Sequence, residues 1–126
     1  RGIDTHGVVR VPRYVEMIRA GDMNPAPAMR LALDLPAMAL LDADRAAGPV
    51  AMTRAARLAA DRARTAGVAL VMVRATTHTG PLGYYTSLAA KSGLAAIAMS
   101  ASGPNMAYHG ARAAGVATNP LSIAVP

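Results

Sequence analysis

The feature that most constrains the fold is a continuous apolar run, residues 67–73, rich in Val and Leu. Such a run is typical of a buried strand. A polar segment with Gly80 follows it, and residues 82–92 then read as a helix that Gly93 ends. The pattern predicts a strand, a turn and a helix. It places His78 at the carboxyl end of the strand, where open α/β sheets bind their ligands.

The rest of the chain alternates in the same way. Helices are expected over residues 11–20, with Pro12 in the first turn, and over residues 48–66, with Arg57 and Asp61 paired one turn apart. Further strands are expected over residues 29–35, 38–42, 94–99 and 121–125, the first two as a possible hairpin. A loop rich in Gly, Pro and Asn precedes the last strand. The fold class is therefore mixed α/β, without repeats.

Composition and charge narrow the functional classes. A chain of 126 residues with 53% hydrophobic content is long enough for one globular core. The absence of cysteine excludes disulfides and thiol nucleophiles, and it fits a reducing compartment, so a cytoplasmic location is expected. No signal peptide or spanning helix is visible, so no membrane partner is expected.

The net charge of +6 comes from 13 basic and seven acidic residues. The arginines are spread along the chain, and four tyrosines are its only aromatic residues. Nucleic-acid binders usually gather basic residues on one face and add stacking aromatics, so a nucleic-acid partner is not expected. The excess positive charge favours a small anionic substrate instead.

Polar side chains gather before the first helix. His6, Arg10 and Tyr14 follow one another at intervals of four residues. An arginine fork pairs with a carboxylate through two hydrogen bonds, and a helix start also favours an anion. Taken alone, the same residues fit a surface helix with solvated arginines and a structural histidine. A metal site from His6, His78 and His109 is not expected, because their spacing is wide and no close ligand pair exists.

The other candidate residues, taken alone, are also explained by ordinary structural roles. His78 could be a hydrogen-bonded structural residue, Ser102 part of a turn, and Thr118 with Asn119 a strand entry. Common catalytic signatures are also missing: the chain has no Gly-x-Gly-x-x-Gly fingerprint, Walker loop, Gly-x-Ser-x-Gly elbow or His-Glu-x-x-His motif. No standard motif therefore assigns a function.

Four motifs in order nevertheless resemble the malate/L-lactate dehydrogenase type 2 family, which includes ureidoglycolate and sulfolactate dehydrogenases and some cyclic imino acid reductases. The matching positions are Asp4-Thr5-His6-Gly7 with Arg10, Pro12, Arg13, Tyr14 and Gly21; Thr77-His78-Thr79-Gly80 with Gly83 and Tyr84; Ser102-Gly103-Pro104-Asn105-Met106-Ala107 with Gly110; and Thr118-Asn119-Pro120 with Ile123, Ala124 and Pro126. Members use NAD or NADP without a Rossmann fold, which agrees with the missing glycine fingerprint.

The resemblance implies a domain organisation. Residues 1–22 would end an amino-terminal helical region, and residues 23–126 would begin the mixed α/β catalytic and cofactor domain. The carboxyl-terminal half of that fold would lie beyond the chain, so the chain is expected to be a fragment that is inactive alone. The resemblance also implies a homodimer acting on a small 2-hydroxy or 2-keto acid.

The resemblance further assigns roles to individual residues. His78 matches the proton acceptor that takes the hydroxyl proton while a hydride leaves C2 for nicotinamide. The other matching positions are His6, Arg10 and Tyr14 for the substrate, and Ser102, Thr118 and Asn119 for the cofactor.

Some residues depart from the family pattern, in which Ser is usual at Thr5, Asn at Thr77 and Phe at Thr79. The changes at Thr77 and Thr79 imply a smaller and more polar pocket wall, and the proton chemistry stays intact. Two alternatives remain: a non-catalytic anion-binding or interaction module using the same basic pocket, and a reductase of cyclic imino acids.

Overall fold

The structure is a computed structural model that describes residues 3–126. It contains the predicted helices and strands in the predicted order, preceded by two short 3-10 turns that the sequence pattern did not indicate. The elements are the turns Asp4–His6 and Val8–Arg10, then α1 Val11–Arg19, β1 Arg30–Leu35, β2 Met38–Ala46, α2 Gly48–Ala66, β3 Leu70–Thr76, α3 Leu82–Ala90, β4 Ala96–Met99 and β5 Leu121–Ala124.

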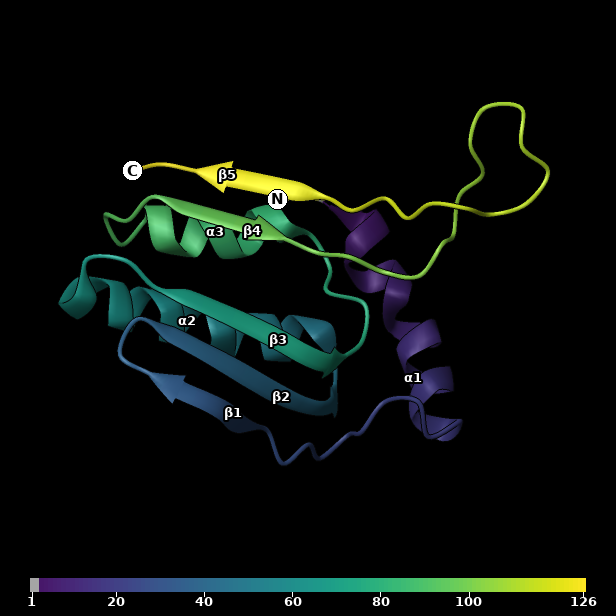
Figure 1. Ribbon diagram of the computed structural model, residues 1–126. Coiled ribbons are helices and arrows are strands. Elements are labelled where there is room, and N and C mark those ends of the chain that lie inside the picture. Colours follow the sequence, from purple (N-terminus) through teal and green to yellow (C-terminus); the bar gives the residue numbers. More distant parts are fainter. Residues whose placement is uncertain (1–2) are drawn as a thin grey trace.

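The strands form two sheets (Figure 1). β1 and β2 form the predicted antiparallel hairpin, in which Leu35 pairs with Met38, and β3 joins β2 in parallel. α2 makes the crossover that a parallel pair requires. β4 and β5 form a separate antiparallel sheet with Ile97 opposite Ile123. The predicted mixed α/β class is confirmed.

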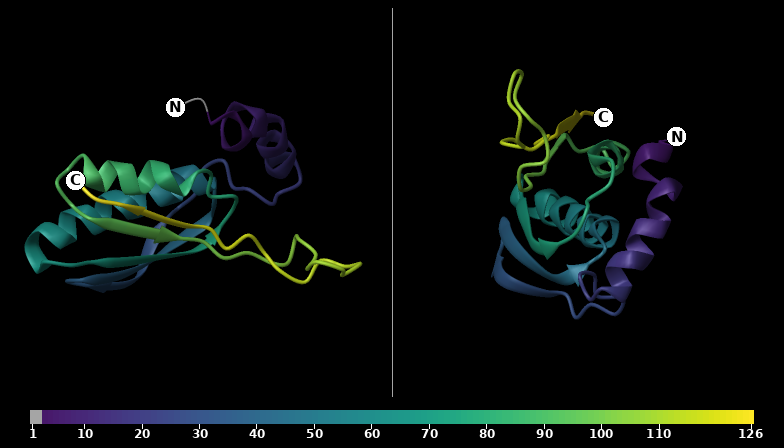
Figure 2. Two further views of the ribbon diagram at one scale, coloured as in Figure 1. Left: turned by 90° about the horizontal axis from the view of Figure 1, so that it is seen from above. Right: turned by 90° about the vertical axis from the view of Figure 1, so that its right-hand side faces the viewer.

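The helices lie in one layer, with one exception. α2 and α3 cover one face of the sheets, whereas α1 stands apart near the carboxyl end of β3 (Figure 2). The core lies where α2 meets β2. Leu41 of β2 is fully buried, and the buried alanines of β2 and α2 are at most 4% exposed. These small side chains let the helix backbone lie close to the sheet.

β2 is longer than the sequence pattern predicts. It continues to Ala46 instead of ending at residue 42, because Ala46 pairs with Thr76 of β3 beyond an irregular stretch. Asp44 and Arg45 adopt positive φ angles of 49° and 57° in that stretch. The Asp44 carboxylate accepts hydrogen bonds from the Asn24 amide at 2.8 Å and from a backbone N–H at 3.0 Å, so a contact with the α1–β1 connection holds this conformation.

Two other local predictions are wrong. Asp61 does not pair with Arg57, because Arg64, three residues after Asp61, donates to its carboxylate at 2.9 Å. The strand predicted over residues 67–73 is β3, and it is not buried throughout. Leu70 and Met72 are 51% and 39% exposed, since helices cover only one face of the sheets.

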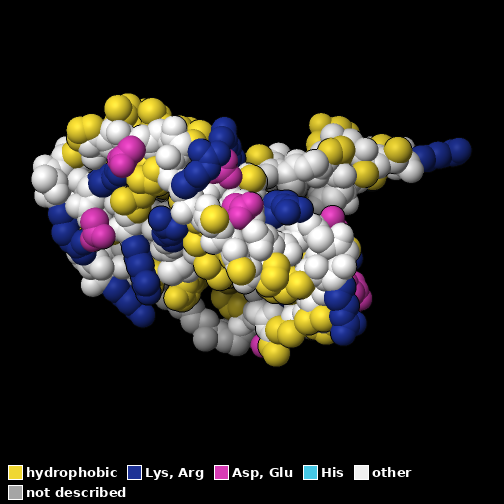
Figure 3. Space-filling model, turned by 90° about the horizontal axis from the view of Figure 1, so that it is seen from below, with side chains coloured by type: hydrophobic (Ala, Val, Ile, Leu, Met, Phe, Trp, Pro, Cys, Tyr) yellow, Lys and Arg dark blue, Asp and Glu magenta, His cyan; other side chains and the backbone are white. Residues whose placement is uncertain are grey.

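The segment of residues 100–120 between β4 and β5 extends away from the layers as a long loop (Figure 1). Met106 and Val116 form a backbone bridge near its base. Basic and acidic side chains alternate over the face seen from below and do not gather in one patch there (Figure 3). Within residues 3–126, no helix is long and apolar enough to cross a membrane.

Candidate active site

His78 lies two residues beyond β3, at the carboxyl end of the strand as the sequence predicted. Its side chain is half-buried. The turn that follows it is tight, because Gly80 is buried and has a φ of +71°. A Cβ at this glycine would lie 3.7 Å from the His6 carbonyl oxygen. The backbone after His78 therefore packs directly against the amino-terminal segment.

The imidazole of His78 is contacted by two aromatic rings from that segment. The Tyr14 hydroxyl lies 3.0 Å from Nδ1 of His78, although 64 residues separate them in the chain. The His6 ring stacks on the His78 ring, with centroids 5.5 Å apart and 29° between the planes. These contacts leave Nε2 of His78 as the nitrogen that is available for a substrate proton.

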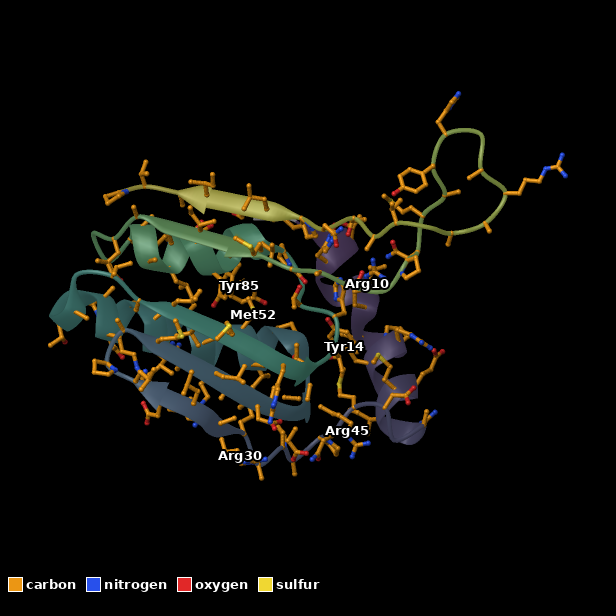
Figure 4. The ribbon with its side chains drawn as sticks, viewed as in Figure 1. Arg10, Tyr14, Arg30, Arg45, Met52 and Tyr85 are labelled. Carbon is orange, nitrogen blue, oxygen red and sulfur yellow. The ribbon has the colours of Figure 1, made fainter. Side chains whose placement is uncertain are left out.

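Arg10 completes the cluster from the second 3-10 turn. Its Nε donates to the Thr5 carbonyl at 2.8 Å, which anchors the guanidinium beside the first turn. The Thr5 hydroxyl in turn lies 3.0 Å from Nδ1 of His6. Figure 4 shows Arg10 and Tyr14 on the side of the amino-terminal segment that faces the sheets. The structure thus brings together the four residues His6, Arg10, Tyr14 and His78.

The electrostatics of the cluster favour neutral side chains at its centre. Burial, reinforced by the nearby charges of Arg10 and His6, lowers the pKa of His78 below its usual 6.5. Burial raises the pKa of Tyr14, an effect that Arg10 partly opposes. At neutral pH the imidazole is therefore uncharged and the phenol keeps its proton. A neutral imidazole beside a guanidinium suits proton abstraction from an anionic substrate.

Tyr85 of α3 supports the segment after His78, and the sequence reasoning did not identify it. Its ring is buried, and its hydroxyl donates to the Thr79 carbonyl. Burial raises the pKa of Tyr85 to about 12, with Tyr14 and Tyr84 adding to the effect, so the phenol remains a donor at any physiological pH. A tyrosine at the start of the helix predicted over residues 82–92 was the available signal.

The candidate cofactor residues lie elsewhere. Ser102, Thr118 and Asn119 are exposed on the loop between β4 and β5, and the Ser102 hydroxyl donates to the neighbouring Gly103 carbonyl at 3.2 Å. Among the described residues, no hydrogen bond joins them to His78. These three predicted site residues therefore lie outside the cluster around His78. His109 lies on the same exposed loop, far in sequence from the two clustered histidines.

Comparison with known proteins matches residues 1–126 to the family described as malate/L-lactate dehydrogenase. The chain is 40% identical over its full length to a malate dehydrogenase of Pyrococcus abyssi, covering 35% of that protein. It is also 40% identical over its full length to a ureidoglycolate dehydrogenase (NAD(+)) of Escherichia coli O157:H7, covering 36% of it.

The fold agrees with these sequence matches. The solved structure of a malate dehydrogenase from Pyrococcus horikoshii OT3 aligns with 99% of the chain at a TM-score of 0.91 and 37% identity, and 36% of that structure is covered. The chain thus spans about a third of the length of these relatives. Because the family match extends from the first residue to the last, the chain belongs to the malate/L-lactate dehydrogenase family.

Proposed function

We propose that this chain forms part of an oxidoreductase that transfers a hydride between a nicotinamide nucleotide, NAD or NADP, and C2 of a small 2-hydroxy acid. The observation that carries the proposal is the convergence of Tyr14 and His6 on the half-buried His78, with Arg10 beside them. Family membership supports it, since the relatives named malate and ureidoglycolate dehydrogenase act on 2-hydroxy acids.

The Tyr14 hydroxyl and Nδ1 of His78 lie 3.0 Å apart, and the proposed role of His78 decides which of the two donates the proton. For His78 to act as a base, Nδ1–H donates to the Tyr14 oxygen and the bare Nε2 faces the substrate. Nε2 takes the proton of the C2 hydroxyl as the alcohol becomes a carbonyl, and the resulting imidazolium keeps the same bond to Tyr14. In the direction of reduction, Nε2 returns that proton to the carbonyl oxygen.

The remaining groups of the cluster hold the substrate. Arg10 uses Nε to bind the Thr5 carbonyl, which leaves its two terminal amino groups in position for a carboxylate. His6, stacked on His78, lies near the reacting oxygen. The Tyr14 phenol keeps its proton and can donate it to the substrate while its oxygen accepts from His78.

The donors on the long loop fit the polar part of a nucleotide. Ser102, Thr118 and Asn119 expose two hydroxyls and an amide, which are groups that bind ribose and phosphate oxygens. When bound, the oxidised nicotinamide would accept the hydride from C2. We assign these three residues to the cofactor. We expect a homodimer, as the family resemblance implies, and a cytoplasmic location, which the absence of cysteine fits.

The test is the pH dependence of the full-length protein with malate, lactate or ureidoglycolate and NAD or NADP. Oxidation needs neutral His78, so kcat/KM for oxidation should fall as the pH drops through the pKa of this group, which burial holds below the ordinary histidine value. His78→Asn should lower kcat by about 10² to 10⁴-fold and remove this dependence.

His6→Asn is the matched control, because it removes the other imidazole of the stacked pair. It should raise the KM for the substrate and leave the acid limb of the pH profile in place. If the limb persists in His78→Asn and disappears in His6→Asn, the two roles are exchanged. A protein that binds carboxylates without any nicotinamide-dependent turnover would be a non-catalytic anion-binding module instead.

A further inference from the structure

The start of α2 lies directly against the backbone of His78, in a contact made possible by a glycine. A Cβ built on Gly48 would lie 2.1 Å from the carbonyl oxygen of His78 and 2.5 Å from its carbonyl carbon. The oxygen of Thr77 would lie 2.7 Å away. Real Cβ atoms essentially never come within 3.0 Å of such atoms, and here the obstacles are backbone. Only glycine permits this approach without a shift of the segment.

A hydroxyl group joins the same two segments by hydrogen bonds. The backbone N–H of Gly48, in the first turn of α2, donates to Oγ1 of Thr77 at 3.1 Å. N–H groups in a first helical turn have no partner within their own helix. Thr77 Oγ1 in turn donates to the Ala46 carbonyl at 3.3 Å. One side chain therefore connects the ends of β2 and β3 with the start of α2.

We propose that Gly48 and Thr77 are positioning residues that set the place of the His78 imidazole relative to Tyr14 and His6. This inference rests on the proposed function, because it takes His78 as the acid/base. The hydrogen bond of 3.0 Å to Tyr14 and the stacking on His6 both come from the amino-terminal segment. A displaced residue 78 therefore loses its alignment with the groups that orient it.

The size of the effect follows from the geometry. A methyl group on residue 48 would have to push the His78 carbonyl by about 1 Å, and a misplacement of this size can lower the rate of a reaction by about 10²-fold. In the full-length protein, Gly48→Ala should lower kcat for oxidation by about 10 to 10²-fold. The substrate KM should change far less, because Arg10 belongs to another segment.

Gly83→Ala is the matched control. Gly83 also lies in the first turn of a helix near the site, but a Cβ there would meet only the Ser122 hydroxyl, at 3.8 Å, which is ordinary contact. This variant should keep a kcat close to that of the wild type. Equal losses in the two glycine variants would overturn the proposal, since they would indicate a general effect of added methyl groups on this part of the fold.

The hydroxyl of Thr77 is tested by a pair of substitutions that avoids the steric clash. Thr77→Ser keeps the group that bonds Gly48 and Ala46, whereas Thr77→Val keeps the shape and loses both bonds. We expect a lower kcat in Thr77→Val and recovery in Thr77→Ser. This pair decides the matter if Gly48→Ala does not fold. A wild-type kcat in Thr77→Val would remove Thr77 from the proposal.

A measurement that does not depend on turnover separates this inference from the proposed function. The NMR titration of His78, assigned by the signal lost in His78→Asn, should move in Gly48→Ala toward the ordinary histidine pKa, because the ring leaves the burial and the charges of Arg10 and His6. An unchanged titration together with a wild-type kcat would refute the positioning role. A fully active His78→Asn would instead refute the proposed function, and the titration would still report on Gly48.

Discussion

At the scale of single residues, Arg10 offers the sharpest test of substrate binding. Its Nε binds the Thr5 carbonyl, so its two terminal amino groups remain for a bidentate interaction with a carboxylate. Arg10→Lys should raise the substrate KM, because an ammonium group cannot copy the planar fork. The lower kcat/KM should correspond to a loss of about 1.5 to 3 kcal/mol in transition-state stabilisation, the usual contribution of a hydrogen bond to a charged group.

Steady-state kinetics of the full-length protein would check this prediction. Arg13→Lys is the control, since Arg13 lies one turn away and makes an exposed ion pair with Glu16 at 3.3 Å. That pair should contribute at most about 1 kcal/mol to stability and nothing to substrate binding. An Arg10→Lys protein with unchanged kcat/KM would show that another group binds the carboxylate.

The residues of the cluster could be named from the sequence, but their contacts could not. The sequence predicted that His6, Arg10 and Tyr14 gather around the start of the first helix. The bond between Tyr14 and His78 spans 64 residues, and no local pattern encodes such a contact. Gly48 was read only as the start of a helix, because its close approach to His78 exists only in the folded chain.

At the scale of elements, Arg62 connects α2 to the β1–β2 hairpin. Its guanidinium donates to the carbonyls of Leu35 and Met38, the latter at 2.9 Å, and pairs with the carboxylate of Asp34. Its side chain is only 15% exposed, so solvent replaces these bonds poorly. Arg62→Met keeps much of the side-chain length and removes the donors. It should lower the free energy of unfolding by about 1 to 3 kcal/mol.

Urea unfolding of the full-length protein would measure this loss. Arg57→Met, an exposed arginine on the same helix, should change the free energy of unfolding by no more than about 0.5 kcal/mol. Similar changes in both variants would mean that the hairpin contact contributes nothing specific. The role of Arg62 was not visible in the sequence, where it is one of several arginines at helical spacing.

At the scale of the whole molecule, the helices leave one face of the sheets uncovered (Figure 2). Several apolar side chains of β4 and β5 are exposed. Ile97 and Ile123 face each other across β4 and β5, and each is 63% exposed. Met99 and Leu121, the next cross-strand pair but one, are 69% and 61% exposed. A patch of this kind, beside open strand edges, favours association.

The 126-residue chain expressed by itself should therefore self-associate. Light scattering coupled to size-exclusion chromatography should give a mass that rises with concentration. Replacing Ile97 and Ile123 by Lys should reduce the association, because the charges cover the patch without disturbing buried groups. A monomer that melts in a sharp transition independent of concentration would show that the chain is a self-sufficient domain.

The alternation of helices and strands, the hairpin, the mixed α/β class and the family could all be predicted from the sequence, because they depend on local periodicity, turn residues and short motifs. The sequence also located His78 at a strand end. The folded chain was needed to show that β2 extends to Ala46 and that one face of β3 stays exposed. It was also needed to show that Tyr14 and Gly48 contact His78 while Ser102 lies on a separate loop. These features arise from packing between segments that are distant in the chain. Which face of a strand a helix covers, and how closely two backbones approach, depends on the segment packed against them and not on the local sequence pattern.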